Sequence, residues 1–147
     1  MTLLDVGNCV VVSPLHSPAS FTVDRNGTSV DTTKYAYAAI VINCGDIWSG
    51  ETVTFHIEQA ATSGGAYTAC KKLGTTDDAT LTVEHADDNT CKLIAIDLNN
   101  TQAFIRARAN HSAGNAHLYS ASIILMPYIT NTTSTATGAA STPEFDI

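Results

Sequence analysis

Hydrophobic residues occur along this chain in short runs that alternate with polar positions. Residues 51–59 show the pattern most clearly, because Val53, Phe55 and Ile57 alternate with polar side chains. A period of two residues is typical of a β-strand with one buried face. No segment shows the three- to four-residue period of an amphipathic helix. The pattern predicts an all-β protein in which two antiparallel sheets pack as a β-sandwich.

Eight or nine strands are expected, because turn residues interrupt the apolar runs at intervals. Asn26-Gly27 is the strongest short hairpin signal, since both residues tolerate positive φ, and we expect it to join two strands. Ser13-Pro14 is expected to end the first segment, which is a strand or an extended arm. Ten segments are candidates for these eight or nine strands, namely residues 6–12, 20–25, 28–31, 34–44, 51–59, 66–72, 79–84, 91–98, 102–109 and 117–128.

The segment 34–44 is apolar on both of its faces. A strand of this kind needs cover on both sides. We therefore expect a central strand that is either enclosed within the domain or placed at a subunit contact, with Tyr35 and Tyr37 as interface residues. One face consists of Tyr35, Tyr37, Ala39 and Val41, and the other of Ala36, Ala38, Ile40 and Ile42.

The length of 147 residues suggests a single domain. We assign the sandwich to residues 20–128, with an N-terminal strand or arm at 1–19 and a flexible C-terminal arm at 129–147. The C-terminal segment is rich in Thr, Ser, Ala and Gly, and two interpretations of it stay open. It is either a disordered terminus or an arm that orders against a neighbouring subunit. The anchors of such an arm would be Pro143, Phe145 and Ile147.

The composition of the chain argues against some classes of partner. Charged residues make up only 14% of the chain, and seven basic against fourteen acidic side chains leave a net charge of −7. This charge repels phosphate, so we expect no nucleic-acid partner. No apolar run reaches the ~18 residues of a membrane span, and the first residues lack the basic and apolar regions of an export signal. We therefore expect neither a membrane partner nor a signal peptide.

The polar residues predict no catalytic or metal chemistry. The four cysteines lack the paired spacing of a zinc site and are interpreted as reduced, buried thiols, with a pairing of Cys70 and Cys91 left open. Asp77-Asp78 and Asp87-Asp88-Asn89 are interpreted as solvated turns rather than Ca²⁺ ligands. No nucleophile elbow or phosphate-binding loop is present. We expect no cofactor, no metal and no enzymatic activity.

Three further side chains are candidate contact residues. Arg106 and Arg108 fall on one face of a predicted strand, where they can contact the carboxylates of a partner. The interpretation we favour is a cross-strand pair with Asp97 or Glu84 of the same domain. Trp48 lies in a loop between two strands, as a sugar platform, an interface anchor or a residue that closes one end of the core.

The order of the predicted strands is similar to that of a known family of proteins. A two-faced aliphatic strand with tyrosines (35–42) is followed by an alternating strand, a glycine turn and Ala66-Tyr67-Thr68. An arginine-bearing strand (104–108) and a closing aliphatic strand (121–126) come later. This order, over residues 20–128, resembles small structural proteins of tailed bacteriophages that decorate or cement the capsid.

The resemblance implies a jelly-roll-like sandwich that forms homotrimers on the outer surface of a capsid and is made in the cytoplasm of a bacterial host. It implies the major capsid protein as partner, with stabilisation of the capsid by bridging of neighbouring capsomers. Both terminal arms would reach adjacent subunits. The Asp-rich segment that such proteins often carry is replaced here by residues 58–65. Two alternatives stay open, a head–tail or tail structural protein and a carbohydrate-binding β-sandwich module.

Overall fold

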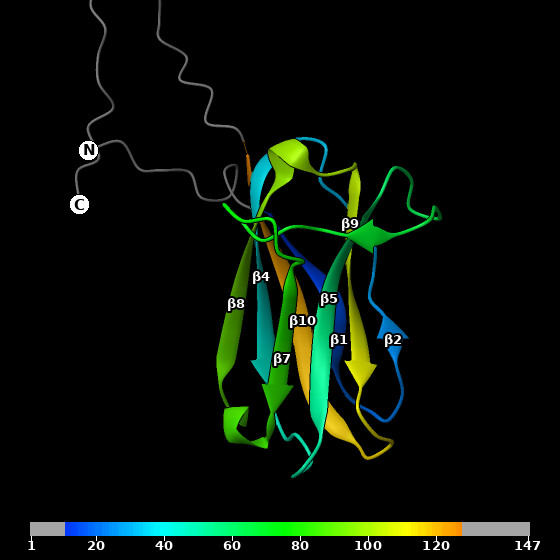
Figure 1. The fold of residues 1–147 in the computed structure, drawn as a ribbon, viewed down its shortest axis with the longest axis vertical. Coiled ribbons are helices and arrows are strands. Elements are labelled where there is room, and N and C mark those ends of the chain that lie inside the picture. The colour runs from blue at the N-terminus through cyan, green and yellow to red at the C-terminus, as the bar shows by residue number, and fades with distance from the viewer. Residues whose placement is uncertain (1–10, 128–147) are drawn as a thin grey trace, which may run out of the picture.

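The computed structural model describes residues 11–127, which form two packed β-sheets (Figure 1). These residues contain ten strands, two short 3₁₀ helices and no α-helix. Neither helix of the described range is long and apolar enough to cross a membrane. The strands are β1 (Val11–Phe21), β2 (Arg25–Asn26), β3 (Val30–Asp31), β4 (Tyr35–Cys44), β5 (Thr52–Ala60), β6 (Thr68–Ala69), β7 (Thr80–Glu84), β8 (Cys91–Asp97), β9 (Phe104–His111) and β10 (His117–Pro127), and the helices are η1 (His85–Asp87) and η2 (Leu98–Asn100).

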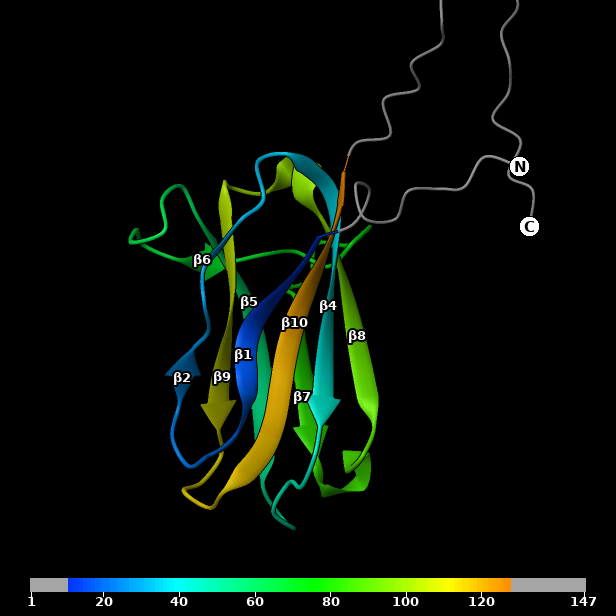
Figure 2. The ribbon, with the colours of Figure 1, turned by 180° about the vertical axis from the view of Figure 1, so that it is seen from behind.

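The two sheets are antiparallel throughout. Sheet A has the strand order β1-β10-β4-β8 (Figure 2). Sheet B has the order β2-β9-β5-β6, with β3 also beside β9 and β7 also beside β5. No two strands of sheet A are consecutive in sequence, because the chain crosses to sheet B after β1, β4 and β8. This repeated crossing is the topology of a jelly roll. The predicted all-β, jelly-roll-like sandwich is confirmed.

The hydrophobic core lies between the sheets and follows the two-residue period of the sequence. On β4, Ile40 and Ile42 are fully buried, while the residues between them point outward. On β5 the predicted inward residues are likewise fully buried. Phe55 and Tyr119 meet edge to face with ring centroids 5.0 Å apart and join the two sheets. Rings in this arrangement add to the stability that burial alone provides.

The first strand differs from the prediction. Strand β1 continues through Pro14 and Pro18 and pairs with β10 as far as Phe21, so the expectation that Ser13-Pro14 ends the first segment is wrong. Proline is tolerated because β1 is an edge strand, and the register shifts beside both prolines absorb the missing N–H donors. The predicted boundary between residues 19 and 20 falls inside this strand. Residues 1–10 and 128–147 lie outside the described range.

The expected hairpin at Asn26-Gly27 is also wrong, since β2 and β3 both pair with β9 rather than with each other. The Gly27 N–H donates to the Ala107 carbonyl at 2.7 Å, and the next N–H, of Thr28, donates to the Leu15 carbonyl at 2.8 Å. A Cβ on Gly27 would lie within 2.6 Å of the Ala107 oxygen and 2.7 Å of the Leu15 oxygen. Glycine is needed for close approach between the sheets, not for a turn with positive φ.

The predicted strand at 66–72 is much shorter in the structure. Only Thr68 and Ala69 form β6, while Lys71 makes an isolated bridge to Asp78. A two-residue strand carries no detectable alternation, so its limits cannot follow from the hydrophobic pattern.

Candidate functional site

The predicted contact residues are not brought together by the fold. Tyr35 and Tyr37 belong to β4 of sheet A, Arg106 and Arg108 to β9 of sheet B, and Trp48 to the loop between β4 and β5. The anchors predicted in the C-terminal arm (Pro143, Phe145 and Ile147) lie outside the described residues. The three surfaces are therefore described in turn.

The outer face of sheet A is apolar. Cross-strand neighbours place Val12, Ile124, Ala39 and Ala95 in one row across all four strands. The next row includes Val41 beside Leu93, and the row above includes Met126 beside Tyr37. Side chains this close across strands form a continuous surface. This surface, called the apolar face below, consists of Val12, Tyr37, Ala39, Val41, Leu93, Ala95, Ile124 and Met126.

The apolar face is accessible and almost uncharged. Val12 is 63% exposed, Leu93 59% and Tyr37 45%. Among the outward positions of the four strands, Asp97 is the one charged residue, and its carboxylate accepts hydrogen bonds from the N–H and side-chain amide of Asn99. Tyr35 is half-buried at the end of β4 and packs against the core. Of the two predicted tyrosines, Tyr37 is therefore the one that contributes an exposed ring to this surface.

The outer face of sheet B is polar and held by an ion pair. The Arg106 Nε and Nη2 atoms lie 2.9 Å and 2.8 Å from the same Glu58 oxygen, and the guanidinium lies 3.7 Å from the centre of the Tyr67 ring. The Tyr67 hydroxyl shares a hydrogen bond with Ser29 and donates to the Ser63 carbonyl. These contacts tie the segment before β6 to β9. Arg106 is therefore a structural residue of this sheet.

The predicted intradomain partners of the arginines are wrong. Glu58 stands directly opposite Arg106 in the pairing of β5 with β9, whereas Asp97 lies on sheet A and Glu84 at the end of β7. The register between strands 48 residues apart decides the partner. Arg108 is opposite His56 and forms no ion pair within residues 11–127.

Trp48 is an exposed ring on an anchored backbone. Its side chain is 55% exposed, so it does not close the end of the core. The neighbouring Ile47 is fully buried and fills that place. The Trp48 N–H donates to Nδ1 of His117 at 3.2 Å, and His117 is itself fully buried. An exposed ring on an anchored backbone suits a contact with a partner or a sugar.

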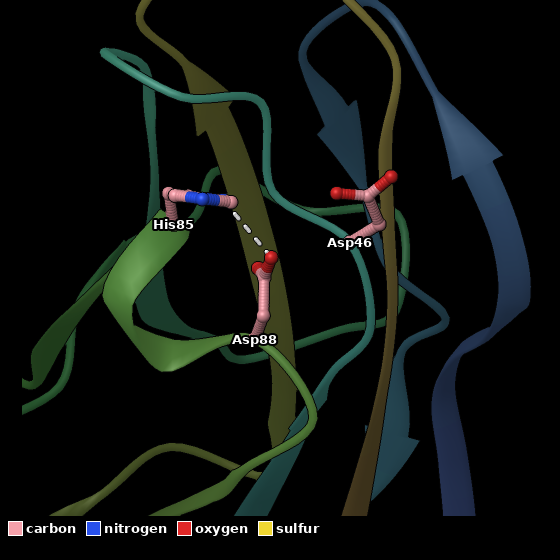
Figure 3. Close-up of side chains that lie close together, drawn as sticks. All are labelled: Asp46, His85 and Asp88. Carbon is pink, nitrogen blue, oxygen red and sulfur yellow. Dashed lines mark ion pairs between the residues drawn. The ribbon is translucent and has the colours of Figure 1, made fainter.

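One group of side chains has the composition of a metal site. The ligand atoms of Asp46, His85 and Asp88 all lie within 4.8 Å of one another (Figure 3). His85 Nδ1 is 3.0 Å from Asp88 Oδ2 and 3.0 Å from the Ile47 carbonyl, while Asp88 Oδ1 accepts from the Ile47 N–H. A hydrogen bond thus engages Asp88 Oδ1, while Asp88 Oδ2 lies beside the imidazole of His85. The contacts of His85 and Asp88 tie the end of η1 to the loop before β5.

The other acidic turns are also held by protein contacts. Asp78 pairs with Lys71 at 2.5 Å, and Asp87 pairs with Lys92 at 2.6 Å and accepts from the Glu84 N–H. The hydrogen bond from Lys92 lowers the pKa of Asp87, because it stabilises the charged carboxylate. These carboxylates pair with nearby lysines, whereas the sequence predicted solvated turn residues.

The cysteines of the described range are free thiols. Cys44 and Cys70 are buried and Cys91 is exposed, so Cys70 and Cys91 do not pair. Burial raises the pKa of Cys70 to about 12, because the charged thiolate is disfavoured in an apolar surrounding. Cys91 lies on the outer side of β8, two residues from Leu93. It gives the apolar face a native thiol at its rim.

A cluster of three histidines, of which His16 and His117 are buried and His111 is half-buried, was not predicted from the sequence. His16, His111 and His117 gather around Tyr119, with the rings of His16 and His111 each 5.8 Å from the tyrosine ring. His111 and His117 are stacked at 5.2 Å, and His117 Nε2 lies 3.1 Å from a Glu51 oxygen. The residues come from β1, β9 and β10, and no short spacing in the sequence relates them.

A shallow hollow lies at the end of the sandwich opposite Trp48. Its volume is about 640 Å³, and it is open to solvent. Polar side chains dominate the lining, which contains no aromatic residue. Sugar sites usually stack the ligand on an aromatic ring. The lining residues are Gln59, Lys71, Lys72, Gly74, Thr75, Thr76, Asp77, Asp97, Asn100 and Thr101.

Comparisons with known proteins define the class of fold. No protein-family model and no curated protein sequence matches the chain. The crystal structure of YomS, a protein derived from the SPBc2 prophage, matches with a TM-score of 0.51 and 14% identity over 79% of this chain and 92% of YomS. The structure of infectious bursal disease virus, Gx strain, matches with a TM-score of 0.50 and 12% identity over 83% of this chain and 32% of that chain. The chain is thus a jelly-roll β-sandwich that spans about a third of the bursal disease virus chain.

Proposed function

We propose that this protein is a non-enzymatic structural protein of a bacteriophage virion. In this proposal it binds the outer surface of the capsid and stabilises it by bridging neighbouring capsomers, with the major capsid protein as partner. The observation that carries the proposal is a small jelly roll of net charge −7 whose sheet A presents an exposed, nearly uncharged apolar face. Exposed apolar surface of this extent is typical of proteins that assemble.

The similar structures support a virion role. YomS is prophage-derived, and the second structure is that of a virus. Jelly rolls are a common architecture of viral capsid domains. The order of strands in the sequence, which resembles phage decoration proteins, points in the same direction. The fold alone is shared with proteins of other functions, so the surface chemistry has to carry the assignment.

A decoration protein acts through contacts rather than through reactions. Each contact buries a modest apolar area, and the symmetry of the capsid repeats it many times. The net charge of −7 repels packaged DNA and suits a protein outside the shell. Such contacts oppose the outward pressure of the genome without any bond being made or broken.

The terminal segments are the second part of the proposal. Val11 pairs with Leu125, so β1 begins and β10 ends at the same end of sheet A. Twenty residues follow Pro127, and in an extended state such a segment spans at most about 70 Å. This length reaches an adjacent subunit. We propose that residues 129–147 make this contact through the three anchors named above.

The direct test uses heads of the virus that carries this gene, purified from a deletion mutant that lacks the protein. We expect purified protein to co-sediment with these heads at a saturating stoichiometry and to raise the temperature at which the heads open. Heads that already carry the protein serve as the control and should bind no more. Absence of co-sedimentation at a large excess of protein would overturn the proposed function.

A carbohydrate-binding module is the second candidate, and the 55% exposure of the Trp48 side chain favours it. The aromatic-free lining of the hollow speaks against it. A glycan array with the natural protein and with Trp48→Ala separates the two functions. Binding of a defined glycan that is lost in Trp48→Ala would support the sugar-binding candidate, whereas the capsid proposal expects no glycan binding by either protein.

A further inference from the structure

We propose that the apolar face of sheet A is the surface through which two copies of this chain associate, packed sheet on sheet about a two-fold axis. Sheet A is apolar on both sides, and its inner side is covered by sheet B. A sheet with two apolar faces is normally covered on both. Within residues 11–127 of a single chain, no segment covers the outer side of sheet A. A second copy supplies it with a surface of identical chemistry.

Charge restricts where two copies can meet. Each copy carries a net charge of −7, so two chains repel each other at most relative orientations. Sheet B exposes His56, Glu58, Glu84, Arg106 and Arg108 along its outer face, and covering it would desolvate these groups. The apolar face carries only Asp97 at its end. Contact there removes apolar surface from water with little loss of charge hydration.

The size of the face is sufficient for a weak pair. Four strands spaced about 4.8 Å apart and three rows spaced about 6.8 Å apart give a face of roughly 400 Å² per copy. Two copies together bury about 800 Å², which is the size of a weak, transient contact. We therefore expect an association that depends on concentration in the micromolar range. Sheets that pack face to face in this way lie about 10 Å apart.

The symmetry follows from the number of suitable surfaces. A two-fold contact needs one self-complementary patch, whereas a closed trimer needs two different patches that fit each other. Within the described residues one extended uncharged face is present. The geometry thus favours a pair over the trimer that the sequence resemblance implies. In solution a second copy covers the face that the proposed function assigns to assembly, so the inference concerns the isolated protein and does not depend on capsid binding.

The first experiment measures mass against concentration for the full chain, by sedimentation equilibrium. We expect the mass to rise from 15.5 kDa toward twice that value. Leu93→Glu places a charge on an exposed edge strand of sheet A, and we expect it to weaken association at least tenfold. Thr82→Glu places the same charge on the exposed edge strand β7 of sheet B and should associate like the natural protein.

Three outcomes would overturn the pairing. They are a monomer at every concentration, a mass of three chains, or unchanged association in Leu93→Glu. Because Leu93 is 59% exposed, the variant should fold, and an unchanged thermal unfolding curve at low concentration confirms this. Co-sedimentation with heads is measured separately, so failure of the pairing and failure of the capsid proposal remain distinguishable.

A second experiment uses the native thiol at the rim of the face. In a Cys9→Ser variant three thiols are left, of which Cys91 is exposed and Cys44 and Cys70 are buried. We expect the rate of maleimide labelling of Cys91 to fall severalfold as the protein concentration rises through the range of association. A constant, fast rate would overturn the proposal. Slow labelling at all concentrations that becomes fast when residues 129–147 are removed would assign the face to the chain's own C-terminal segment instead.

Discussion

Sheet A and sheet B use their inner faces alike but differ on their outer faces. Both contribute fully buried residues to one core, such as Ile40 from β4 and Phe55 from β5. Outside, β5 alternates its apolar residues with Thr, His and Glu, whereas β4 alternates them with Tyr, Ala and Val. Folding of one chain needs only the inner faces. Within residues 11–127 no segment covers the second apolar face, which lies on the outer side of sheet A.

The two outer faces also differ in how they are held together. Sheet B is cross-linked by specific contacts, above all Arg106 with Glu58 and Tyr67. The apolar face has no such contact and consists of side chains that match by size and polarity alone. Specific polar contacts fix an arrangement, whereas apolar surface favours burial by any partner of suitable shape. The comparison thus separates a surface held by specific polar contacts from one that is apolar and exposed.

The largest expected effect compares neighbouring residues on opposite sides of β4. Ile40 is fully buried, so Ile40→Ala should lower the free energy of unfolding by about 2–5 kcal/mol. Val41 belongs to the outer side, and Val41→Ala should cost less than about 1 kcal/mol when the protein is dilute. Urea unfolding at low concentration measures both. Equal losses would mean that the outer side is already covered within one chain.

A smaller effect is expected on sheet B. Arg106→Ala should lower the free energy of unfolding by about 1–2 kcal/mol, because it removes a charged hydrogen bond and a cation–π contact. Arg108→Ala is the matched control on the same strand and should change it by less than about 0.5 kcal/mol. Arg106→Lys keeps the charge but not the planar stack and should fall between them. Equal values for both alanine variants would contradict a structural role for Arg106.

Local periodicity explains which parts of the fold were predictable. The inward and outward sides of residues 51–59 and 102–109 follow from alternation alone, and the structure confirms them. The two-sided apolar pattern of 34–44 correctly indicated a strand with two apolar faces. The sequence of β8 has the same pattern, with Leu93 and Ala95 on the outer side. The two-sided apolar pattern of β8 therefore also predicts that the apolar face extends to the edge of sheet A.

Long-range pairing explains what the sequence could not provide. The Arg106 partner depends on the register of β5 against β9, and the close approach at Gly27 depends on two strands that are distant in sequence. The prolines of β1 predict the end of a strand when only the sequence is considered. In the structure β1 pairs with β10 alone and is an edge strand, where proline is allowed. The histidine cluster has the same origin, since His16 and His111 come together around Tyr119 only when the sheets pack.

The smallest expected effect is a dependence of stability on pH. It comes from histidines of the interior and not from either outer face. The pKa of His16 lies below its ordinary value of 6.5, mainly because burial disfavours the charged ring, although the Ala107 carbonyl acts against this. The pKa of His111 is lowered by burial and by the neighbouring His117, with Asp24 and Glu51 acting in the opposite direction. The unfolded chain therefore binds protons first as the pH falls.

It follows that stability is fully present above about pH 6.5 and declines as the pH drops from there through the lowered pKa values of the folded state. His111→Gln should make this decline shallower while costing about 1 kcal/mol or less at neutral pH, since it removes one hydrogen bond with Tyr119. Urea unfolding at pH 7.5 and pH 5 measures the slope. Arg108→Ala, on the outer face of sheet B, should leave the slope unchanged. A slope unaffected by His111→Gln would contradict the prediction. It would mean that groups outside the histidine cluster, such as surface carboxylates, cause the pH dependence.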